Sequence, residues 1–381
     1  MGIAGLNRLL KRHAPYAFGE ITLDQLRGTR VAIDCYNWIH TSYPSAKKTV
    51  IYRTNVVKED PDEDEIFREW MSLLFDFIRN WVNYSITPVF VFDGNAPMEK
   101  SDTRKKRRED QQKTRDRMLE ARDKVRNSNP LLITAVMIDD LRKRMVNTRS
   151  IAAESIEYMK ALLKKLGIPY LQAKNEGEQL CSMLAREGVV SAVYSADTDN
   201  SAYGTPLRIT GFSGLKPTSA GYVMKCKCVW HENVLKQLDY THDKFIDLCI
   251  LSGCDYNTNM PKIAIFTAYK LLNQYQTIDA FPASEYIHLH VLKHHRCRQM
   301  FTPVPSESLI EEGFMEYQRD KLDLLQPHLE QLEIFDRQYY LVTLFYKLEQ
   351  PSTKLIHPSP PDIPVVKKYD NITLIVVPHK I

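Results

Sequence analysis

Three stretches of the sequence decide the fold: RVAID at residues 30–34, PVFVFD at residues 88–93 and AVYSAD at residues 192–197. Each stretch is a short apolar run that ends in an aspartate. Such runs are typical of parallel strands that are buried on both faces. Because helical patterns lie between them, at residues 66–84 and 155–166, the sequence predicts an α/β fold. We expect a wound, mostly parallel sheet with helices on both faces.

The three aspartates, Asp34, Asp93 and Asp197, are predicted to lie at one edge of this sheet. Parallel strands point the same way, so their carboxyl ends meet at a common edge. In wound α/β folds that edge is where ligands bind. The strand ends are therefore the first candidates for a functional site.

A basic insertion, residues 95–150, separates the second and third predicted strands. Residues 100–126 hold twelve Lys or Arg against six Asp or Glu. A solvated charged hairpin would explain this run without any function. Its position directly after Asp93 favours a helical arch over the site, with Arg104, Lys105 and Arg108 binding nucleic acid.

The region after the predicted sheet is mainly helical. A helix over residues 241–253 is followed by one that we expect to start at Pro261 and run to Gln274. With Lys262 and Lys270 nearby, the pair is predicted to be a helix-turn-helix element, although many helical hairpins bind nothing. Residues 306–349 are predicted to be helical, and the proline-rich tail ends in a strand-like TLIVV.

Composition sets limits on the class of protein. The chain of 381 residues is 44% hydrophobic and 26% charged, with a formal net charge of +4. That balance permits an acidic partner without demanding one. No run is apolar and long enough for a membrane span, and no signal peptide is evident. Seven cysteines, an odd number, indicate reduced thiols and an intracellular protein.

Seven carboxylates form the candidate catalytic set. Each has a local structural explanation, such as a helix start for Glu176 and Glu178 or a turn for Asp255. Their combination is harder to explain, because clustered carboxylates repel one another unless cations neutralise them. Oxygen ligands without His or Cys suit Mg²⁺ or Mn²⁺, and two such ions about 3.5–4 Å apart would support phosphodiester hydrolysis. The set comprises Asp34, Asp93, Glu176, Glu178, Asp197, Asp199 and Asp255.

The sequence resembles the flap endonuclease family, the 5′ nucleases that include the xeroderma pigmentosum G protein. The resemblance covers about residues 1–275 and rests on several motifs in the same order. The motifs are MGIAGLNRLL at the N-terminus, VAID, VFDGNAPMEK, GIPYLQAKNEGEQLC, SADTD and LCILSGCDY.

This resemblance implies a PIN-like fold and two Mg²⁺ ions bound by acids matching the seven above. Asp93 and Glu178 would hold one ion; Glu176, Asp197 and Asp199 would hold the other, and Asp34 and Asp255 would help through water. It also implies that Lys100 and Arg107, at the base of the arch, contact the scissile phosphate. A free 5′ end would thread through the arch, and Gly2 would lie where duplex DNA bends.

Two departures from the family pattern affect nucleic-acid binding. His40 stands where the family usually has a tyrosine that stacks on a base. The glycine-rich hairpin turn of the family reads KIAIF at residues 262–266 here, so duplex and K⁺ binding at that turn are open. No convincing sliding-clamp motif is present, since QYYL at residues 338–341 fits a buried helix better. The departures fit a divergent member, such as a viral one.

The sequence therefore predicts a Mg²⁺-dependent 5′ flap endonuclease and 5′ exonuclease acting as a monomer on branched or nicked DNA in replication, repair or recombination. An RNA-cleaving relative and an inactive nucleic-acid-binding scaffold are the alternatives. We expect it in the nucleus or at a viral replication site, and not at a membrane. Its predicted segments are the nuclease domain (1–94 and 151–240), the arch (95–150), the helix-turn-helix element (241–275), a helical region (276–349) and a tail (350–381).

Overall fold

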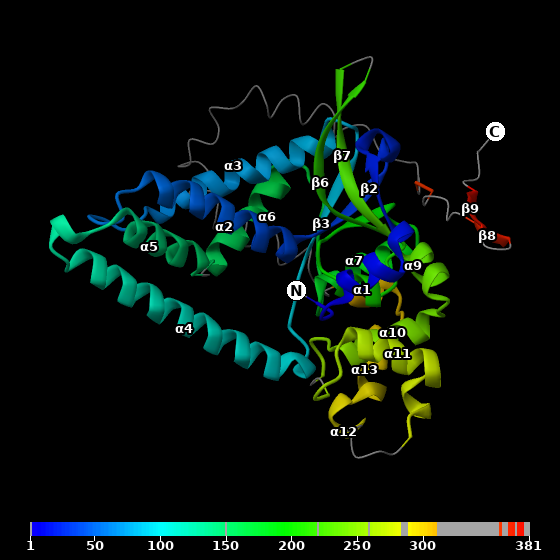
Figure 1. Cartoon of the computed structure of the whole chain (residues 1–381). Coiled ribbons are helices and arrows are strands. Elements are labelled where there is room, and N and C mark those ends of the chain that lie inside the picture. The colour runs from blue at the N-terminus through cyan, green and yellow to red at the C-terminus, as the bar shows by residue number, and fades with distance from the viewer. Residues whose placement is uncertain are drawn as a thin grey trace. The chain divides into compact units, whose positions relative to one another are not determined.

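The structure is a computed structural model that describes residues 2–148, 151–218, 221–257, 260–282, 289–310, 358–359, 365–369 and 372–376 (Figure 1). The chain forms two compact units. Unit 1 comprises residues 1–33, 178–309 and 353–381, and unit 2 comprises residues 34–177 and 310–352. The division into six segments stays a prediction, and the predicted helices at 311–349 lie outside the described residues.

The main sheet strands of unit 1 run in the order β1-β7-β6-β5-β2. β2 pairs with β5 and β5 pairs with β6 in parallel, whereas β7 is antiparallel to both β6 and β1. The third predicted strand is shorter than expected, because β5 ends at Tyr194 and Asp197 follows it in a turn. The strands are β1 (Phe18–Thr22), β2 (Arg30–Asp34), β5 (Ala192–Tyr194), β6 (Leu207–Thr218) and β7 (Gly221–Trp230).

The long β6–β7 hairpin of unit 1 was not predicted (Figure 1). Its signal is the alternation in KCKC, where Cys226 and Cys228 are buried and Lys227 is exposed. Register shifts after Ile209 and after Phe212 bend the hairpin. A second, separate ladder pairs β8 (Val365–Tyr369) with β9 (Ile372–Val376), where the sequence predicted a strand.

The helices of unit 1 include the predicted helical hairpin. The first helix is capped by Thr241, whose side chain accepts a hydrogen bond from the Lys244 N–H. The second starts at Ile265 and not at Pro261, so the predicted start was wrong. The cause is Lys262, whose φ of 66° is left-handed and cannot belong to a right-handed helix. The helices are α1 (Leu6–His13), α7 (Gly177–Arg186), α8 (Asp199–Ala202), α9 (His231–Leu238), α10 (His242–Ser252), α11 (Ile265–Tyr275), α12 (Leu289–Leu292) and α13 (His294–Phe301), with short 3₁₀ turns η1 (Pro15–Ala17), η2 (Leu23–Leu26), η5 (Ile278–Ala280) and η6 (Ser306–Leu309).

Unit 2 contains the parallel strands β3 (Thr87–Phe92) and β4 (Tyr170–Gln172). The predicted helices at 66–84 and 155–166 are present, and Gly167 closes the second with a φ of 67°. Parallel strands alternating with helices in both units confirm the predicted α/β class. The helices are α2 (Cys35–Arg53), α3 (Glu63–Val82), α4 (Ser101–Arg126), α5 (Ala135–Asn147) and α6 (Ala153–Lys165), with turns η3 (Met98–Lys100) and η4 (Pro130–Leu132).

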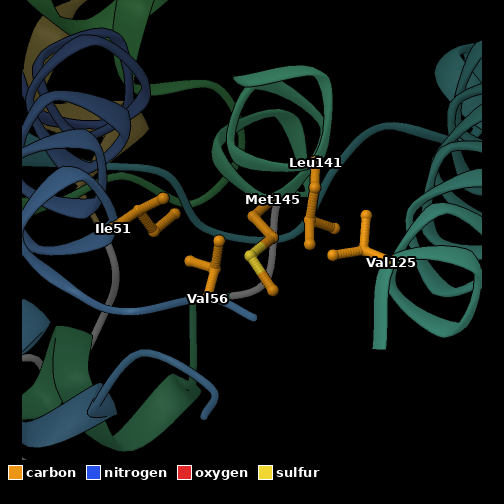
Figure 2. Packing of buried hydrophobic residues seen from close by; sticks show 5 residues of the cluster. All are labelled: Ile51, Val56, Val125, Leu141 and Met145. Atoms are coloured by element: carbon orange, nitrogen blue, oxygen red, sulfur yellow. The ribbon is translucent and has the colours of Figure 1, made fainter. Parts of the chain in front are cut away.

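The basic insertion is a helical hairpin, α4 and α5, with a small hydrophobic core of its own. Figure 2 shows Val125 of α4 facing Leu141 and Met145 of α5, with Ile51 and Val56 on the other side of Met145. All five side chains are buried. The basic residues 104–108 near the start of α4 are exposed. The insertion is thus anchored near the far end of α4, and its cations remain available to solvent.

The seven cysteines are all buried and none forms a disulfide. This agrees with the reduced thiols that the sequence predicts. In the part of the chain that the structure describes, no helix combines the length and the apolar character needed to span a membrane.

Candidate active site

Three predicted metal ligands come together in unit 1. Glu178 lies in the first turn of α7, Asp197 follows β5 and Asp199 begins α8. All three side chains are buried, and one carboxylate oxygen of each lies within 4.8 Å of the others. We call these residues the unit 1 acids. Such a group of oxygens is suited to a hard divalent cation.

The turn after β5 positions two of the unit 1 acids. The Asp197 N–H donates to Ser195 Oγ at 3.0 Å, and the Asp199 N–H donates to Asp197 Oδ1 at 3.2 Å. The side chains therefore converge through a turn and a helix start. The prediction that Asp197 is the last residue of the strand was wrong, because the strand stops at Tyr194.

Gly2 lies against this turn. Its φ is 87°, and a Cβ added there would lie 2.1 Å from Asp197 Oδ1 and 2.5 Å from Thr198 Oγ1. No other amino acid fits without moving the turn. Because the Thr198 hydroxyl also donates to the Ile3 carbonyl at 3.5 Å, the N-terminal residues help to fix the unit 1 acids.

Arg208 of β6 is a buried cation behind the same turn, and the sequence analysis missed it. Its side chain donates from Nη1 to the carbonyl oxygens of Asp197, at 3.1 Å, and Ser195, at 3.5 Å. Its Nε and Nη2 have no hydrogen-bond partner among the described residues. Burial lowers the pKa of Arg208 to about 10, and Asp197 and Asp199 oppose that shift. A single arginine inside the apolar strand LRIT was the available signal.

Asp255 does not belong to that group of oxygens in the described structure. It lies in the turn after α10, where Gly253 has a φ of 97°, and it is half-buried. Its predicted role, binding a metal through water, requires no direct contact with the other acids.

Unit 2 holds the other three predicted ligands, Asp34, Asp93 and Glu176, which we call the unit 2 acids. Asp34 is buried and caps α2, accepting a hydrogen bond from the Asn37 N–H at 3.0 Å. The pKa of Asp93 is raised to about 7 by burial and by the charges of Asp34 and Glu176. This mutual repulsion is the property that bound cations would relieve.

Lys100 is the counter-ion of the unit 2 acids. Its ammonium group forms an ion pair with the Glu176 carboxylate, and both side chains are buried. Lys100 also lowers the pKa of Asp93, although burial and the neighbouring acids outweigh it. The predicted phosphate ligand therefore already contacts a predicted metal ligand.

Gly177 and Gln172 hold Asp93 in place, and neither was predicted to do so. The Gly177 N–H donates to Asp93 Oδ1 at 2.7 Å, and Gln172 Nε2 donates to the Asp93 carbonyl at 2.6 Å. A Cβ on Gly177 would lie 2.7 Å from Asp93 Oδ1. The glycine between Glu176 and Glu178 is thus needed for the main chain to approach the Asp93 carboxylate this closely.

Comparisons with known proteins identify the family. A model of the XPG N-terminal domain matches residues 1–114, and a model of the XPG I-region matches residues 167–255. Flap endonuclease 1 of Cryptosporidium muris is 31% identical over 87% of this chain and 67% of that protein. Flap endonuclease 1 of Debaryomyces hansenii is 32% identical over 73% of this chain and 68% of that protein.

This chain belongs to the flap endonuclease and XPG family. The fold agrees, since flap endonuclease-1 from Methanococcus jannaschii aligns with a TM-score of 0.52 and 22% identity over 87% of this chain and 96% of that one. Membership confirms the predicted family, fold and enzyme class. The chain is a structure-specific 5′ nuclease.

Within this flap endonuclease relative, the predicted nucleic-acid ligands of unit 2 are solvent-accessible. Arg104, Lys105, Arg107 and Arg108 are exposed on α4, and His40 is half-exposed on α2. A cavity of about 580 Å³ borders α4; its lining includes Lys47, Arg108, Arg115 and Arg122, together with Asp60 and Glu63.

The predicted hairpin ligands of unit 1, Lys262 and Lys270, are also exposed. Lys262 adopts a left-handed φ of 66° without being a glycine. The turn therefore keeps a backbone shape that usually requires glycine, but carries a lysine side chain at that position.

Proposed function

We propose that this chain hydrolyses phosphodiesters of branched DNA, at 5′ flaps and nicks in replication or repair, with the unit 1 and unit 2 acids as its metal ligands. One observation carries the proposal: three buried carboxylates, Glu178, Asp197 and Asp199, whose oxygens lie within 4.8 Å of one another. Burying several carboxylates without cations costs several kcal/mol each, roughly, so a cation is the simplest explanation.

The donor set fits Mg²⁺, with Mn²⁺ as a substitute. Every side chain in the two acid groups offers carboxylate oxygen and none offers nitrogen or sulfur. Two bound ions would activate the attacking water and stabilise the leaving oxygen. The carboxylates are held in position for that chemistry by Gly177, Gln172 and the turn after β5.

Lys100 has two roles in this proposal. It pairs with Glu176 in the structure, and if cations neutralised that carboxylate its ammonium group would be available to bind the scissile phosphate. Arg107, exposed on α4, would be the second phosphate ligand. Such donors stabilise the charge that develops on the phosphate during in-line attack.

The proposed substrate class is tested with end-labelled substrates. Wild-type protein is incubated with a DNA flap, a nicked duplex, a single strand and a matched RNA flap, in Mg²⁺ and in EDTA. We expect a Mg²⁺-dependent cut near the DNA flap junction that is absent in EDTA. Cleavage confined to the RNA flap would assign the chain to the RNA-cutting alternative. No cleavage by folded protein in Mg²⁺ or Mn²⁺ would leave only the binding scaffold.

The seven buried thiols, none of which is in a disulfide, support the additional proposal that the protein works in a reducing, intracellular compartment.

A further inference from the structure

Two histidines and an aspartate of unit 1 bring their ligand atoms together at a second place in the chain. His294 and His295 are the first two residues of α13, and Asp279 lies in η5. Each residue offers one ring nitrogen or carboxylate oxygen, and these three atoms lie within 4.8 Å of one another. We call the three residues the Asp-His-His cluster. None of them has a role in the proposed nuclease centre.

The spacing of these three atoms suits a small ion with tetrahedral coordination. His294 Nε2 lies 2.8 Å and His295 Nε2 lies 3.8 Å from the same oxygen, Asp279 Oδ1. Zn²⁺ holds nitrogen and oxygen ligands at about 2.0–2.2 Å in a tetrahedron, so its ligand atoms lie about 3.3 Å from one another. The two observed distances fall on either side of that value. A shift of about 0.5 Å in each ring would therefore admit the ion.

The two imidazole rings lie as neighbouring ligands of one ion would. Their centroids are 4.1 Å apart and their planes are tilted by 38°. Two protonated rings at that separation would repel each other, whereas two neutral rings can both offer Nε2 to one cation. Ligation through Nε2 leaves the ring proton on Nδ1. Zn²⁺ would thus take the place of the proton in the hydrogen bond between His294 and Asp279.

A hydrogen-bond network fixes the aspartate of the cluster. Arg298, one turn further along α13, donates from Nη1 to Asp279 Oδ2 at 2.6 Å and so leaves Oδ1 facing the histidines. The same guanidinium donates to both oxygens of the buried Asp247 of α10, at 2.7 Å and 2.8 Å. Partners of this kind orient metal ligands. Because two carboxylates face one guanidinium, the network keeps one negative charge that attracts a cation.

We propose that the Asp-His-His cluster binds one Zn²⁺ ion, with water as the fourth ligand. Mixed nitrogen and oxygen donors suit Zn²⁺ better than Mg²⁺, which prefers oxygen alone. The side chain of His295 is 76% exposed, so solvent reaches the open fourth position. This inference goes beyond the proposed function and does not depend on it, because the two acid groups offer only oxygen and share no residue with the cluster.

Zn²⁺ bound to the cluster would add a link between η5 and the start of α13, two segments that Arg298 already joins. An ion that binds the folded chain and not the unfolded one raises the thermal unfolding midpoint. α13 packs on α10, so the added link should stabilise this helical part of unit 1. Loss of an outer partner of a metal ligand weakens binding about 10- to 100-fold, so loss of both histidines should weaken it by at least about 100-fold.

The test is calorimetric titration of the full-length chain, without a histidine tag, with Zn²⁺ in excess Mg²⁺. The variants are the double substitution His294→Gln with His295→Gln, the single substitution His295→Gln, and the matched histidine control His13→Gln on α1. We expect one Zn²⁺ per wild-type chain and per control chain, weaker binding by the single variant, and the loss given above in the double variant. Zn²⁺ should raise the unfolding midpoint of the wild type and of the control, but not of the double variant. His295→Gln changes an exposed side chain, so it keeps the test valid if the double variant folds poorly.

Wild-type Zn²⁺ affinity in the double variant would overturn the proposal, and so would a wild-type chain that binds no Zn²⁺. Asp197→Asn separates the cluster from the unit 1 acids and should bind Zn²⁺ as the wild type does. If Asp197→Asn lost a Zn²⁺ ion that the double variant kept, the ion would belong to the acids and the proposal would be wrong.

Flap cleavage in Mg²⁺ without Zn²⁺ is measured alongside. The double variant should cut at the wild-type rate, because the cluster is not part of the proposed nuclease centre. If the wild type cuts flaps but binds no Zn²⁺, this inference alone fails. If the wild type binds Zn²⁺ through the two histidines but cuts nothing, only the proposed function fails.

Discussion

The two acid groups balance their negative charge in different ways. In unit 2, Lys100 pairs directly with the carboxylate of Glu176. In unit 1, Arg208 donates to the main-chain carbonyl of Asp197 and so sits behind the turn. A cation on a carboxylate must move before a metal can use that oxygen, whereas a cation behind the backbone can stay. The two groups should therefore respond differently to metal.

The largest expected effect comes from the unit 1 acids. Asp197→Asn keeps the size of the side chain but removes a charge from the group of three oxygens. We expect flap cleavage in saturating Mg²⁺ to fall by about 10³-fold or more, since metal and phosphate chemistry both depend on that charge. Single-turnover rates measure the loss, and Asp243→Asn, on the exposed first turn of α10, is the control. Normal cleavage by Asp197→Asn would end the metal assignment.

The next effect tests the counter-ion of unit 2. Lys100→Met should lower the cleavage rate roughly 10²-fold through loss of a phosphate donor. It should also leave the unit 2 acids without their cation, so Mg²⁺ should raise the thermal unfolding midpoint more in this variant than in the wild type. The exposed Lys164→Met provides the matched control. An equal Mg²⁺-induced shift in both proteins would show that Lys100 does not neutralise Glu176.

Lowering the pH should change the stability of the two units in opposite directions. The pKa of Asp93 in the folded chain is about 7, above its ordinary value, so its contribution to stability is full at low pH and is lost as pH rises through 7. Burial, then His242 and nearby arginines, lowers the pKa of His231 to about 3. Its contribution is full above its ordinary value near 6.5 and is lost as pH falls.

Moving from pH 7.5 to 5.5 without metal should thus stabilise unit 2 and destabilise unit 1, each by on the order of 1 kcal/mol. Hydrogen-exchange protection factors of α3 and α10, measured at both pH values in EDTA, report the two changes separately. Asp93→Asn should remove the gain in unit 2, and His231→Phe the loss in unit 1. If the protection factors of α3 and α10 changed in the same direction, the predicted difference in pH dependence between the two units would be wrong.

The smallest effect concerns Arg208. Arg208→Met removes a buried positive charge near Asp197 and Asp199, so the unit 1 acids become more strongly negative. We expect the Mg²⁺ concentration for half-maximal cleavage to fall several-fold in this variant and to stay near the wild-type value in Arg208→Lys. Identical Mg²⁺ requirements in all three proteins would mean that the charge behind the turn has no influence on metal binding.

Strand ends were predictable from the sequence because buried parallel strands have a strong apolar signature. β2 matches its predicted bounds, and β3 differs by one residue at each end. β5 was overextended, because it ends at Tyr194 and Ser195 and Ala196 lie outside the strand, although the Ser195 N–H still donates to the Ile209 carbonyl of β6 at 2.9 Å. Local pattern cannot tell where a ladder stops, since that depends on a neighbouring strand.

Other features depend on tertiary contacts that no local pattern encodes. The sequence places an arginine in LRIT, but only the fold shows that Arg208 lies behind the turn after β5. The role of Gly177 likewise depends on Asp93, which is 84 residues away. From the sequence, only the lack of a glycine in the turn at Lys262 could be seen. The left-handed backbone of Lys262 shows that the turn can keep its shape without a glycine.

The burial of all seven thiols makes the native chain nearly inert toward maleimide dyes. Burial raises the pKa of Cys35, Cys226 and Cys249, so thiolate, the reactive form, is scarce at neutral pH. A single cysteine introduced at Leu131, which is 91% exposed where α4 turns toward α5, would then carry one dye without removal of any native cysteine. Energy transfer from that dye to a second dye on a 5′ end would test whether the strand passes through the predicted arch.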